Sequence, residues 1–357
     1  MKIEQTTLTQ KAIDLLKQLI SIQSFSSEED KTAEAIEQWF MNFDIPFERI
    51  NNNVFAKNKY WDNAKPTLLL NSHHDTVKPN KAYTKDPFDP HIEDGKLYGL
   101  GSNDAGGALV SLMATFVHFY DAENLNHNIL IVASAEEENA GKNSLRGLLS
   151  SLPKIDVAIV GEPTLMQLAI AEKGLVVFDA VVKGTPSHAA HPNDNNAIYN
   201  TIEVLEWFKN YGFKKTSETL GDVKMTVTQI NAGSQHNVVP AQVELVVDVR
   251  VNDQYTNKEI ADLLKSEAPC ELQERGLNLN SSKIDKGHAL VRSGIALGRT
   301  TYGSPTLSDQ AALTCQSLKL GPGDSTRSHS ADEYIYVREI EEGIHLYIKI
   351  LEGFLTK

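Results

Sequence analysis

The sequence has 357 residues, a length at which two domains are more common than one larger core. Hydrophobic residues at 41% and charged residues at 23% are typical of a folded globular protein, which excludes collagen-like, disulfide-scaffold and largely disordered chains. The 34 basic and 47 acidic residues leave a net charge of −13, so we expect no nucleic-acid partner, because the protein would repel a phosphate backbone.

Cysteine content and apolar run lengths bear on the compartment. Two cysteines cannot form a disulfide framework, and the first residues show no apolar stretch of signal-peptide length. The apolar runs are strand-length, far below the roughly 18 to 20 residues that cross a bilayer. We therefore expect a cytoplasmic protein without a membrane partner.

The first half of the chain alternates helical and strand patterns. Residues 8–20 carry apolar side chains at helical spacing, and S-S-E-E at residues 26–29 resembles a capping box before a second amphipathic helix. Apolar runs at residues 54–57, 67–70, 128–135 and 156–160 alternate with helical patterns at residues 105–120 and 144–149. This order predicts an α/β fold with a mostly parallel sheet.

The pattern changes near residue 175 and returns near residue 288. Strands at 175–183, 223–231 and 241–251 and helices at 195–210 and 257–266 give the β-α-β-β-α order of a ferredoxin-like sandwich. A small-residue helix near 309–316, a strand at 317–320 and a final helix at 337–355 then follow. We predict one domain from residues 1–174 and 288–357, interrupted by an inserted domain of residues 175–287.

Five polar clusters follow the predicted strands or open a neighbouring helix. They are S-H-H-D-T-V at 72–77, G-L-G-S-N-D-A-G-G at 99–107, E-E-E at 136–138, G-E-P-T at 161–164, and G-P-G at 321–323 with His329 six residues later. Alone, each has an ordinary interpretation as a polar turn, a helix cap or solvated carboxylates. Because open α/β sheets bind ligands at the carboxyl ends of their strands, all five can face one crevice.

Together these clusters offer a set of metal ligands. Imidazole and carboxylate donors suit zinc or a similar divalent ion, and adjacent carboxylates repel one another when desolvated unless a cation gathers them. The donors outnumber what one zinc ion uses. A pair of metals about 3.5 to 4 Å apart, bridged by one carboxylate, accounts for the surplus.

The combined motifs resemble the M20 metallopeptidase family. The resemblance rests on H-x-D-x-V at 73–77, G-x-G-x-x-D-x-x-G at 99–107, the Glu pair, G-E-P-T, and G-P-G followed by H-x-x-D-E-Y at 329–334. Within the family it is strongest to the acetylornithine deacetylase and succinyl-diaminopimelate desuccinylase branch. Two positions depart from the family pattern, with Glu136 in place of Asp and Ser72 in place of Gly. The resemblance implies a di-zinc hydrolase with an inserted α+β lid domain that forms a homodimer.

The resemblance also implies roles for individual residues. The ligands of one zinc ion would be His73, Asp104 and Glu162, and those of the other Asp104, Glu138 and His329, with cobalt a possible substitute. Asp75 would orient His73. Glu137 matches the general base, which takes a proton from the attacking water and returns it to the leaving amine.

Three residues of the inserted domain match family positions. G-T-P-S-H-A-A-H-P at 184–192 resembles the lid motif whose first histidine reaches the partner's active site, which assigns oxyanion stabilisation to His188 rather than His191. Asn237 and Arg250 resemble the residues that bind the substrate carboxylate, a contact suited to the guanidinium group. An exposed strand end is the ordinary alternative for Arg250.

The expected function is hydrolysis of an N-acyl amino acid. N-acetylornithine, an intermediate of arginine biosynthesis, is the leading substrate. N-acetylcitrulline, N-acetyllysine and N-succinyl amino acids, including succinyl-diaminopimelate, are alternatives, as is a small dipeptide. A non-catalytic metal-binding protein is a remote alternative, which the presence of Glu137 disfavours. A Ser-His-Asp hydrolase is weaker still, because the sequence lacks a G-x-S-x-G motif.

Overall fold

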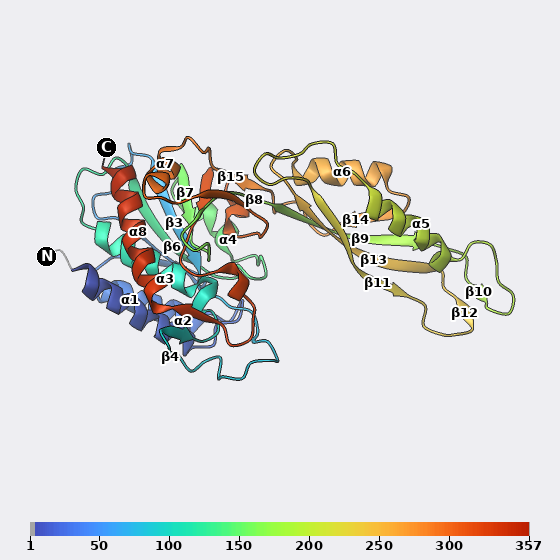
Figure 1. Cartoon of the computed structure of the whole chain (residues 1–357), viewed down its shortest axis with the longest axis horizontal. Coiled ribbons are helices and arrows are strands. Elements are labelled where there is room, and N and C mark those ends of the chain that lie inside the picture. The colour runs from blue at the N-terminus through green and yellow to red at the C-terminus, as the bar shows by residue number, and fades with distance from the viewer. Residues whose placement is uncertain (1–3, 357) are drawn as a thin grey trace. The chain divides into compact units, whose positions relative to one another are not determined.

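The computed structural model describes residues 4–356 and divides into two compact units (Figure 1). The larger unit comprises residues 4–170, 283–302 and 308–356, and the smaller unit comprises Ala171–Ser282 and Gly303–Leu307. The unit boundaries lie about four or five residues before the predicted positions, and residues 303–307 return to the smaller unit. None of the described residues forms a helix long and apolar enough to cross a membrane.

A mixed sheet forms the centre of the larger unit. Its strands, in spatial order, are β1 (Glu48–Ile50), β2 (Asn53–Lys57), β6 (Asn128–Ser134), β3 (Thr67–His73), β7 (Val157–Val160), β17 (Gln316–Lys319), β8 (Leu168–Glu172) and β15 (Ser282–Lys283), with β16 (Thr301–Ser304) paired to β8. The four central strands β6, β3, β7 and β17 run parallel. This arrangement confirms the predicted α/β class with a mostly parallel sheet.

Helices cover both faces of this sheet, so the central strands β3, β6 and β7 are buried along their whole length. Leu68 and Leu70 belong to a core shared with most of the helices, whereas Leu69 between them packs with α4 on the opposite face. The helices of the larger unit are α1 (Gln5–Ile20), α2 (Asp30–Met41), α3 (Gly107–Phe119), α4 (Leu145–Leu148), α7 (Ala289–Ala296) and α8 (Val337–Leu355). A small antiparallel sheet contains β4 (His91–Glu93), β5 (Lys96–Tyr98) and β18 (Tyr334–Tyr336).

The smaller unit is a four-stranded antiparallel sheet with two helices packed on one face. The spatial order is β11 (Lys224–Ala232), β13 (Gln242–Val251), β9 (Gly174–Lys183) and β14 (Glu271–Glu274). Residues of α5 (Ala197–Asn210) and α6 (Asn257–Glu267) share its single hydrophobic core. A short ribbon pairs β10 (Ser187–His188) with β12 (Val238–Val239). The order matches the expected ferredoxin-like sandwich, with β14 added as the strand that the sequence pattern missed.

Two local predictions were wrong. The capping box at residues 26–29 does not form: no side chain caps α2, and Glu29 is buried, with only 1% of its surface exposed. Glu29 instead accepts hydrogen bonds from the side chain of Asn52 and the backbone of Glu136, which satisfy its desolvated carboxylate. The helix expected near residues 309–316 is a single 3₁₀ turn at Asp309–Ala312, because β17 already begins at Gln316.

Candidate metal centre

The predicted polar clusters meet at one edge of the larger unit's sheet. His73 is the last residue of β3, and Glu162 lies two residues beyond the end of β7. Glu137 follows β6, and His329 lies in the segment that leaves β17. Because these four strands are parallel, their carboxyl ends place the side chains together. Asp104 joins them from a kinked turn at Ser102–Gly106, directly before α3, in which the backbone angles of Asp104 itself are not helical.

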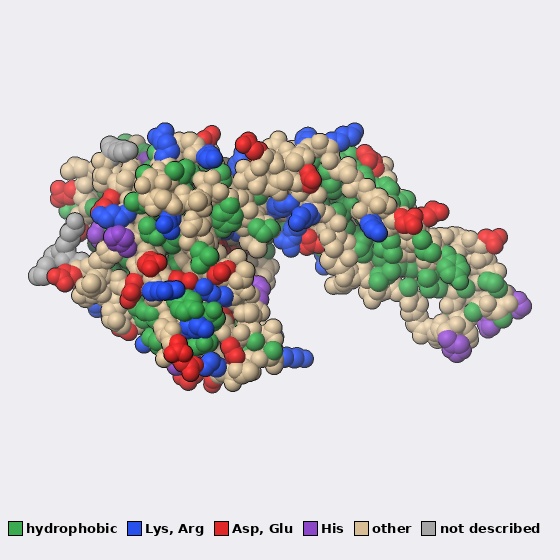
Figure 2. All heavy atoms as spheres, viewed as in Figure 1, with side chains coloured by type: hydrophobic (Ala, Val, Ile, Leu, Met, Phe, Trp, Pro, Cys, Tyr) green, Lys and Arg blue, Asp and Glu red, His purple; other side chains and the backbone are tan. Residues whose placement is uncertain are grey.

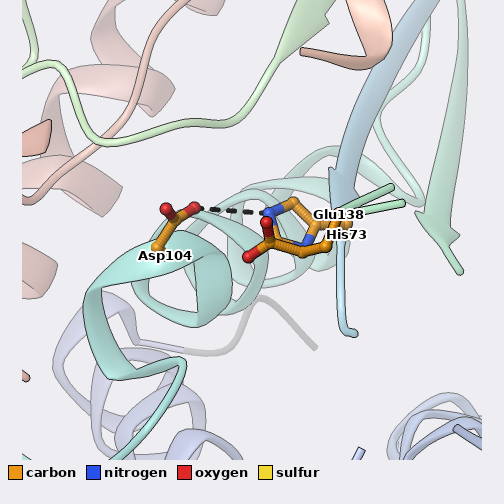
Figure 3. Close-up of side chains that lie close together, drawn as sticks. All are labelled: His73, Asp104 and Glu138. Atoms are coloured by element: carbon orange, nitrogen blue, oxygen red, sulfur yellow. Dashed lines mark ion pairs between the residues drawn. The ribbon is translucent and has the colours of Figure 1, made fainter. Parts of the chain in front are cut away.

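Four carboxylates lie around the ring of His73. Its Nε2 atom lies 3.4 Å from Oδ1 of Asp104 and 3.9 Å from Oε1 of Glu162. In Figure 3 the Asp104 carboxylate points toward the His73 ring, and Glu138 lies beside that ring. His73, Asp104 and Glu138 offer ligand atoms within 4.8 Å of one another, and so do His73, Glu137 and Glu162.

A second histidine lies on the other side of Asp104. Nε2 of His329 is 3.0 Å from Oε2 of Glu138 and 3.7 Å from Oδ2 of Asp104. The two oxygens of Asp104 therefore face different imidazoles, Oδ1 toward His73 and Oδ2 toward His329. This is the arrangement required of a carboxylate that bridges two ions.

The electrostatics of the cluster fit bound cations. Burial, followed by the negative charge of Asp104, raises the pKa of Glu162 from 4.5 to about 8. Burial and the neighbouring carboxylates, including Glu162 and Glu138, also raise the pKa of Glu137 well above its usual value, although His73 partly offsets them. Divalent cations would remove this repulsion, and the nitrogen and oxygen donors match those that zinc accepts. The residues present thus fit a metal centre.

Asp75 fixes the geometry around His73, though differently from the prediction. Nδ1 of His73 lies 2.9 Å from the backbone oxygen of Asp75 and 3.4 Å from its carboxylate, so the carbonyl is the closer acceptor. The carboxylate accepts the backbone N–H groups of Glu137 at 3.0 Å and Glu138 at 3.1 Å, and the hydroxyl of Ser26 at 2.7 Å. Asp75 therefore positions the imidazole mainly through its backbone oxygen and the acidic loop through its side chain.

The structure places the three consecutive glutamates in different surroundings. Glu136 adopts a positive φ of 53°, and its carboxylate accepts two hydrogen bonds from Asn143, at 3.0 and 2.8 Å. Glu137 and Glu138 instead lie beside His73 and His329. Glu137 and Glu138, rather than Glu136, therefore border the cluster of histidines and carboxylates.

Two buried carboxylates at the centre had no predicted role. Asp309 accepts hydrogen bonds from Asn71 at 2.8 Å and Ser134 at 2.6 Å, which connects the ends of β3 and β6. Glu333 accepts three backbone N–H groups from the turn that carries Asp104. Burial and the charge of Asp104 raise the pKa of Glu333 to about 8. The sequence signal for Glu333 is its position in H-x-x-D-E-Y, and Asp309 lies in the segment predicted to be a helix.

The remaining predicted residues lie in the smaller unit. His188 is in β10, and the next residue, Ala189, donates its N–H to the backbone oxygen of Asn237 at 2.9 Å, so His188 and Asn237 are neighbours. Arg250 is near the far end of β13 and makes two hydrogen bonds to Asp248, at 2.9 and 3.1 Å. Within this unit, Arg250 is not brought together with the other two.

Comparison with known proteins identifies the family. The model of peptidase family M20/M25/M40 matches residues 69–353. The chain belongs to this family. The prediction from the motifs is therefore confirmed, as is that of a metal-dependent amide hydrolase, which rests on the family match together with the clustered donors.

Several relatives of this M20-family chain align over nearly its whole length. A succinyl-diaminopimelate desuccinylase of Wolbachia pipientis wMel is 26% identical, with 96% of this chain and 93% of the relative covered. A [LysW]-lysine/[LysW]-ornithine hydrolase of Sulfurisphaera tokodaii is 24% identical, covering 100% and 99%. Among solved structures, the Bacillus subtilis YxeP protein, a dinuclear metal binding peptidase, has a TM-score of 0.74 at 15% identity, covering 98% of each chain.

The pKa values of the centre predict how metal removal changes stability with pH. Folded Glu162 and Glu333, with pKa values near 8 instead of 4.5, hold protons that the unfolded chain has released. His329, whose pKa its hydrogen bond to Glu138 raises from 6.5 to about 9, acts in the same direction. The melting temperature of chelator-treated protein should therefore fall as pH rises from 6.5 to 8.

Calorimetry with and without zinc checks this expectation. Zinc should flatten the pH dependence, because the cation takes the place of the protons, and Glu162→Gln should reduce the slope of the chelated protein. A melting temperature that is constant or rises over this range in chelator would contradict the electrostatic account.

Proposed function

We propose that this chain is a di-zinc deacylase that releases a free amino acid from its N-acylated form. The observation that carries the proposal is the Asp104 carboxylate, whose two oxygens face His73 and His329 separately. His73 and Glu162 complete one set of ligands, and Glu138 and His329 complete the other. The dinuclear centre named for the YxeP protein, which shares the fold, supports two ions here.

Glu137 is the general base in this proposal. Its side chain is 14% exposed and lies 4.0 Å from Nε2 of His73, so it borders the ligands while still reaching water. Bound zinc ions supply Lewis acidity, which polarises the scissile carbonyl and acidifies the attacking water. Glu137 accepts the proton of that water and donates it to the departing amine nitrogen.

The substrate we propose is an N-acylated diamino acid. The names of the two curated relatives contain diaminopimelate, lysine and ornithine, each of which carries two amino groups. N-acetylornithine, the leading substrate expected from the sequence, belongs to this class. The name of the desuccinylase supports N-succinyl substrates as well as N-acetyl substrates. A substrate panel that includes both acyl groups distinguishes them.

We propose a homodimer formed through the smaller unit. Ile198, Tyr199 and Ile202 on α5 are 44%, 70% and 57% exposed, and Ile230 on the edge strand β11 is 55% exposed. Figure 2 shows hydrophobic side chains gathered over this part of the smaller unit. Contiguous exposed apolar surface beside an unpaired strand edge is typical of a protein interface.

The length of β13 supports a site shared between subunits. Gln242, at the end of β13 near the His188 ribbon, and Arg250 are eight residues apart, which corresponds to about 27 Å along a strand. A single amino-acid substrate cannot touch both ends of such a strand. In our proposal Arg250 binds the carboxylate of a substrate in one subunit, while His188 and Asn237 reach the substrate of the partner.

The hydrogen bonding of His188 suits oxyanion stabilisation. The backbone N–H of Ala190 donates to Nδ1 of His188 at 3.1 Å, so a neutral ring carries its proton on Nε2. That N–H is then free to donate to the oxygen on which negative charge develops.

A substrate panel with metal analysis tests the function. We expect hydrolysis of N-acetyl or N-succinyl derivatives among ornithine, citrulline, lysine and diaminopimelate, and two zinc ions per chain by elemental analysis. Dipeptides serve as the comparison for peptidase activity. Full activity with one ion per chain would contradict the di-zinc assignment, and cleavage of dipeptides alone would contradict the deacylase assignment.

Replacing the general base should lower turnover strongly without removing metal. Glu137→Gln should lose roughly 10² to 10⁴-fold in kcat, because the amide cannot accept a proton. Glu138→Gln should instead lose zinc affinity. Glu136→Gln is the matched control, since that carboxylate binds Asn143 rather than the centre. Near-normal turnover by Glu137→Gln would show that another group is the base.

Subunit mixing tests whether His188 acts across the dimer. His188→Ala should lower kcat more than it raises KM, because an oxyanion contact forms mainly in the transition state, whereas Arg250→Ala should chiefly raise KM. Heterodimers of His188→Ala with Glu137→Gln should regain activity, since one composite site keeps both residues. Verified heterodimers without activity would place His188 outside the partner's site.

A further inference from the structure

The segment that carries His329 is fastened at both ends to the turn that carries Asp104. At its beginning, the Asn103 side chain pairs with the backbone of Asp324, accepting its N–H at 3.0 Å and donating to its oxygen at 3.1 Å. At its end, the backbone oxygen of Glu333 accepts the N–H of Gly99 at 3.0 Å. Residues 324–333 thus form a closed loop on this turn.

The Glu333 side chain makes the larger part of this connection. Its Oε1 atom accepts the N–H groups of Asn103 at 2.8 Å and Asp104 at 2.9 Å, and its Oε2 atom accepts that of Gly101 at 3.2 Å. Glu333 is only 2% exposed, so water does not compete for these contacts. Both carboxylate oxygens are therefore used to hold the backbone of the turn.

We propose that Glu333 is a positioning residue that sets the affinity of the metal site formed by Asp104, Glu138 and His329. The inference rests on the proposed di-zinc function and goes beyond it, because Glu333 binds no metal itself. It lies four residues after His329 in the chain and contacts the backbone of Asp104, so one carboxylate ties these two ligands together.

This connection matters most for His329, because its side chain is 54% exposed and packing alone does not hold it. His73 is 1% exposed, and its ring is already oriented by the backbone of Asp75. Loss of the Glu333 contacts should therefore free His329 relative to Asp104 while His73 and Glu162 keep their places. The ion between Asp104 and His329 should weaken selectively.

Glu333→Gln is the main variant. The amide keeps one oxygen that can accept two N–H groups, but it turns an NH₂ group toward the N–H of Gly101 or toward those of Asn103 and Asp104. The matched control is Glu339→Gln, which breaks the ion pair that Arg327 of the same loop makes at 2.7 Å. The control loosens the loop without touching the Asp104 turn.

Zinc binding is measured by calorimetry against a competing chelator, and the absorption spectrum of the cobalt-loaded protein reports ligand geometry. We expect Glu333→Gln to weaken the second ion about 10 to 100-fold, the usual effect of residues that orient metal ligands, and to alter the cobalt spectrum. Its first ion, and both ions of Glu339→Gln, should stay within about threefold of the unmodified protein.

The same zinc-binding measurement in a His329→Ala variant identifies which ion Glu333 affects. In His329→Ala, which retains the His73 site, adding Glu333→Gln should change the affinity of the remaining ion by less than about threefold. An equal loss there, an equal loss in Glu339→Gln, or two normal affinities in Glu333→Gln would each overturn the inference.

A second substitution at Glu333 and the number of ions bound by the unmodified protein distinguish failure of this proposal from failure of the di-zinc proposal. If Glu333→Gln does not fold, Glu333→Asp applies the same criteria, because its shorter side chain keeps the charge but does not span three N–H groups. If the unmodified protein itself binds one ion, the di-zinc proposal fails. If the unmodified protein binds two ions and only the Glu333 expectations fail, the proposal about Glu333 alone is wrong.

Discussion

The metal centre depends on holding several carboxylates close together where little water reaches them. The side chains of Glu137, Glu138 and Glu162 are 14%, 9% and 12% exposed, and all lie near the Asp104 carboxylate or the two imidazoles. Their mutual repulsion has to be balanced by donors that the protein supplies. Backbone N–H groups stabilise the two carboxylates beside the cluster, two for Asp75 and three for Glu333, and bound divalent cations would balance the charge of the cluster itself.

Because these donors belong to the backbone, the sheet has to be built correctly before the site exists. His73 continues a strand that is buried along its whole length, and its neighbours β6 and β7 end at the acidic loops. A shift of register in one of these strands would move a ligand to the wrong face of the sheet. The burial of the central strands thus specifies the chemistry at their ends.

The parts of the site that the sequence predicted are those with local signals. Strand-length apolar runs followed by His73, Glu137 or Glu162 indicated which residues stand at strand ends, and parallel order then brought them together. Glu29 had a local signal too, but a misleading one: its partner, the backbone of Glu136, is 107 residues away. Asp309 and Glu333 likewise act through distant segments, Asp309 on Ser134 and Glu333 on the Asp104 turn, and no short pattern records such contacts.

The smaller unit shows a second limit of prediction from the sequence. Its strands and helices followed the predicted periodicity closely, yet a pattern of elements does not say which residues meet. The pairing register of β13 with β9 places Arg250 opposite Leu175 and Gln242 opposite Lys183, at the two ends of the strand. Asn237, which the prediction assigned to the same substrate carboxylate as Arg250, precedes the Gln242 end. The two residues are therefore separated by the length of β13. Strand pairing, rather than secondary-structure propensity, determines which of these residues can contact the same substrate molecule.

The position of β17 has a consequence for how the protein is made. This strand lies between β7 and β8 in the sheet, although nearly all of the smaller unit, from residue 173 to residue 282, is synthesised between β8 and β17. During synthesis on the ribosome, the sheet of the N-terminal segments therefore lacks β17, the strand between β7 and β8, while the smaller unit emerges. The smaller unit has its own core and can fold during this interval. His329, beyond β17, is synthesised after every other proposed ligand, so the complete set of proposed ligands exists only late in synthesis.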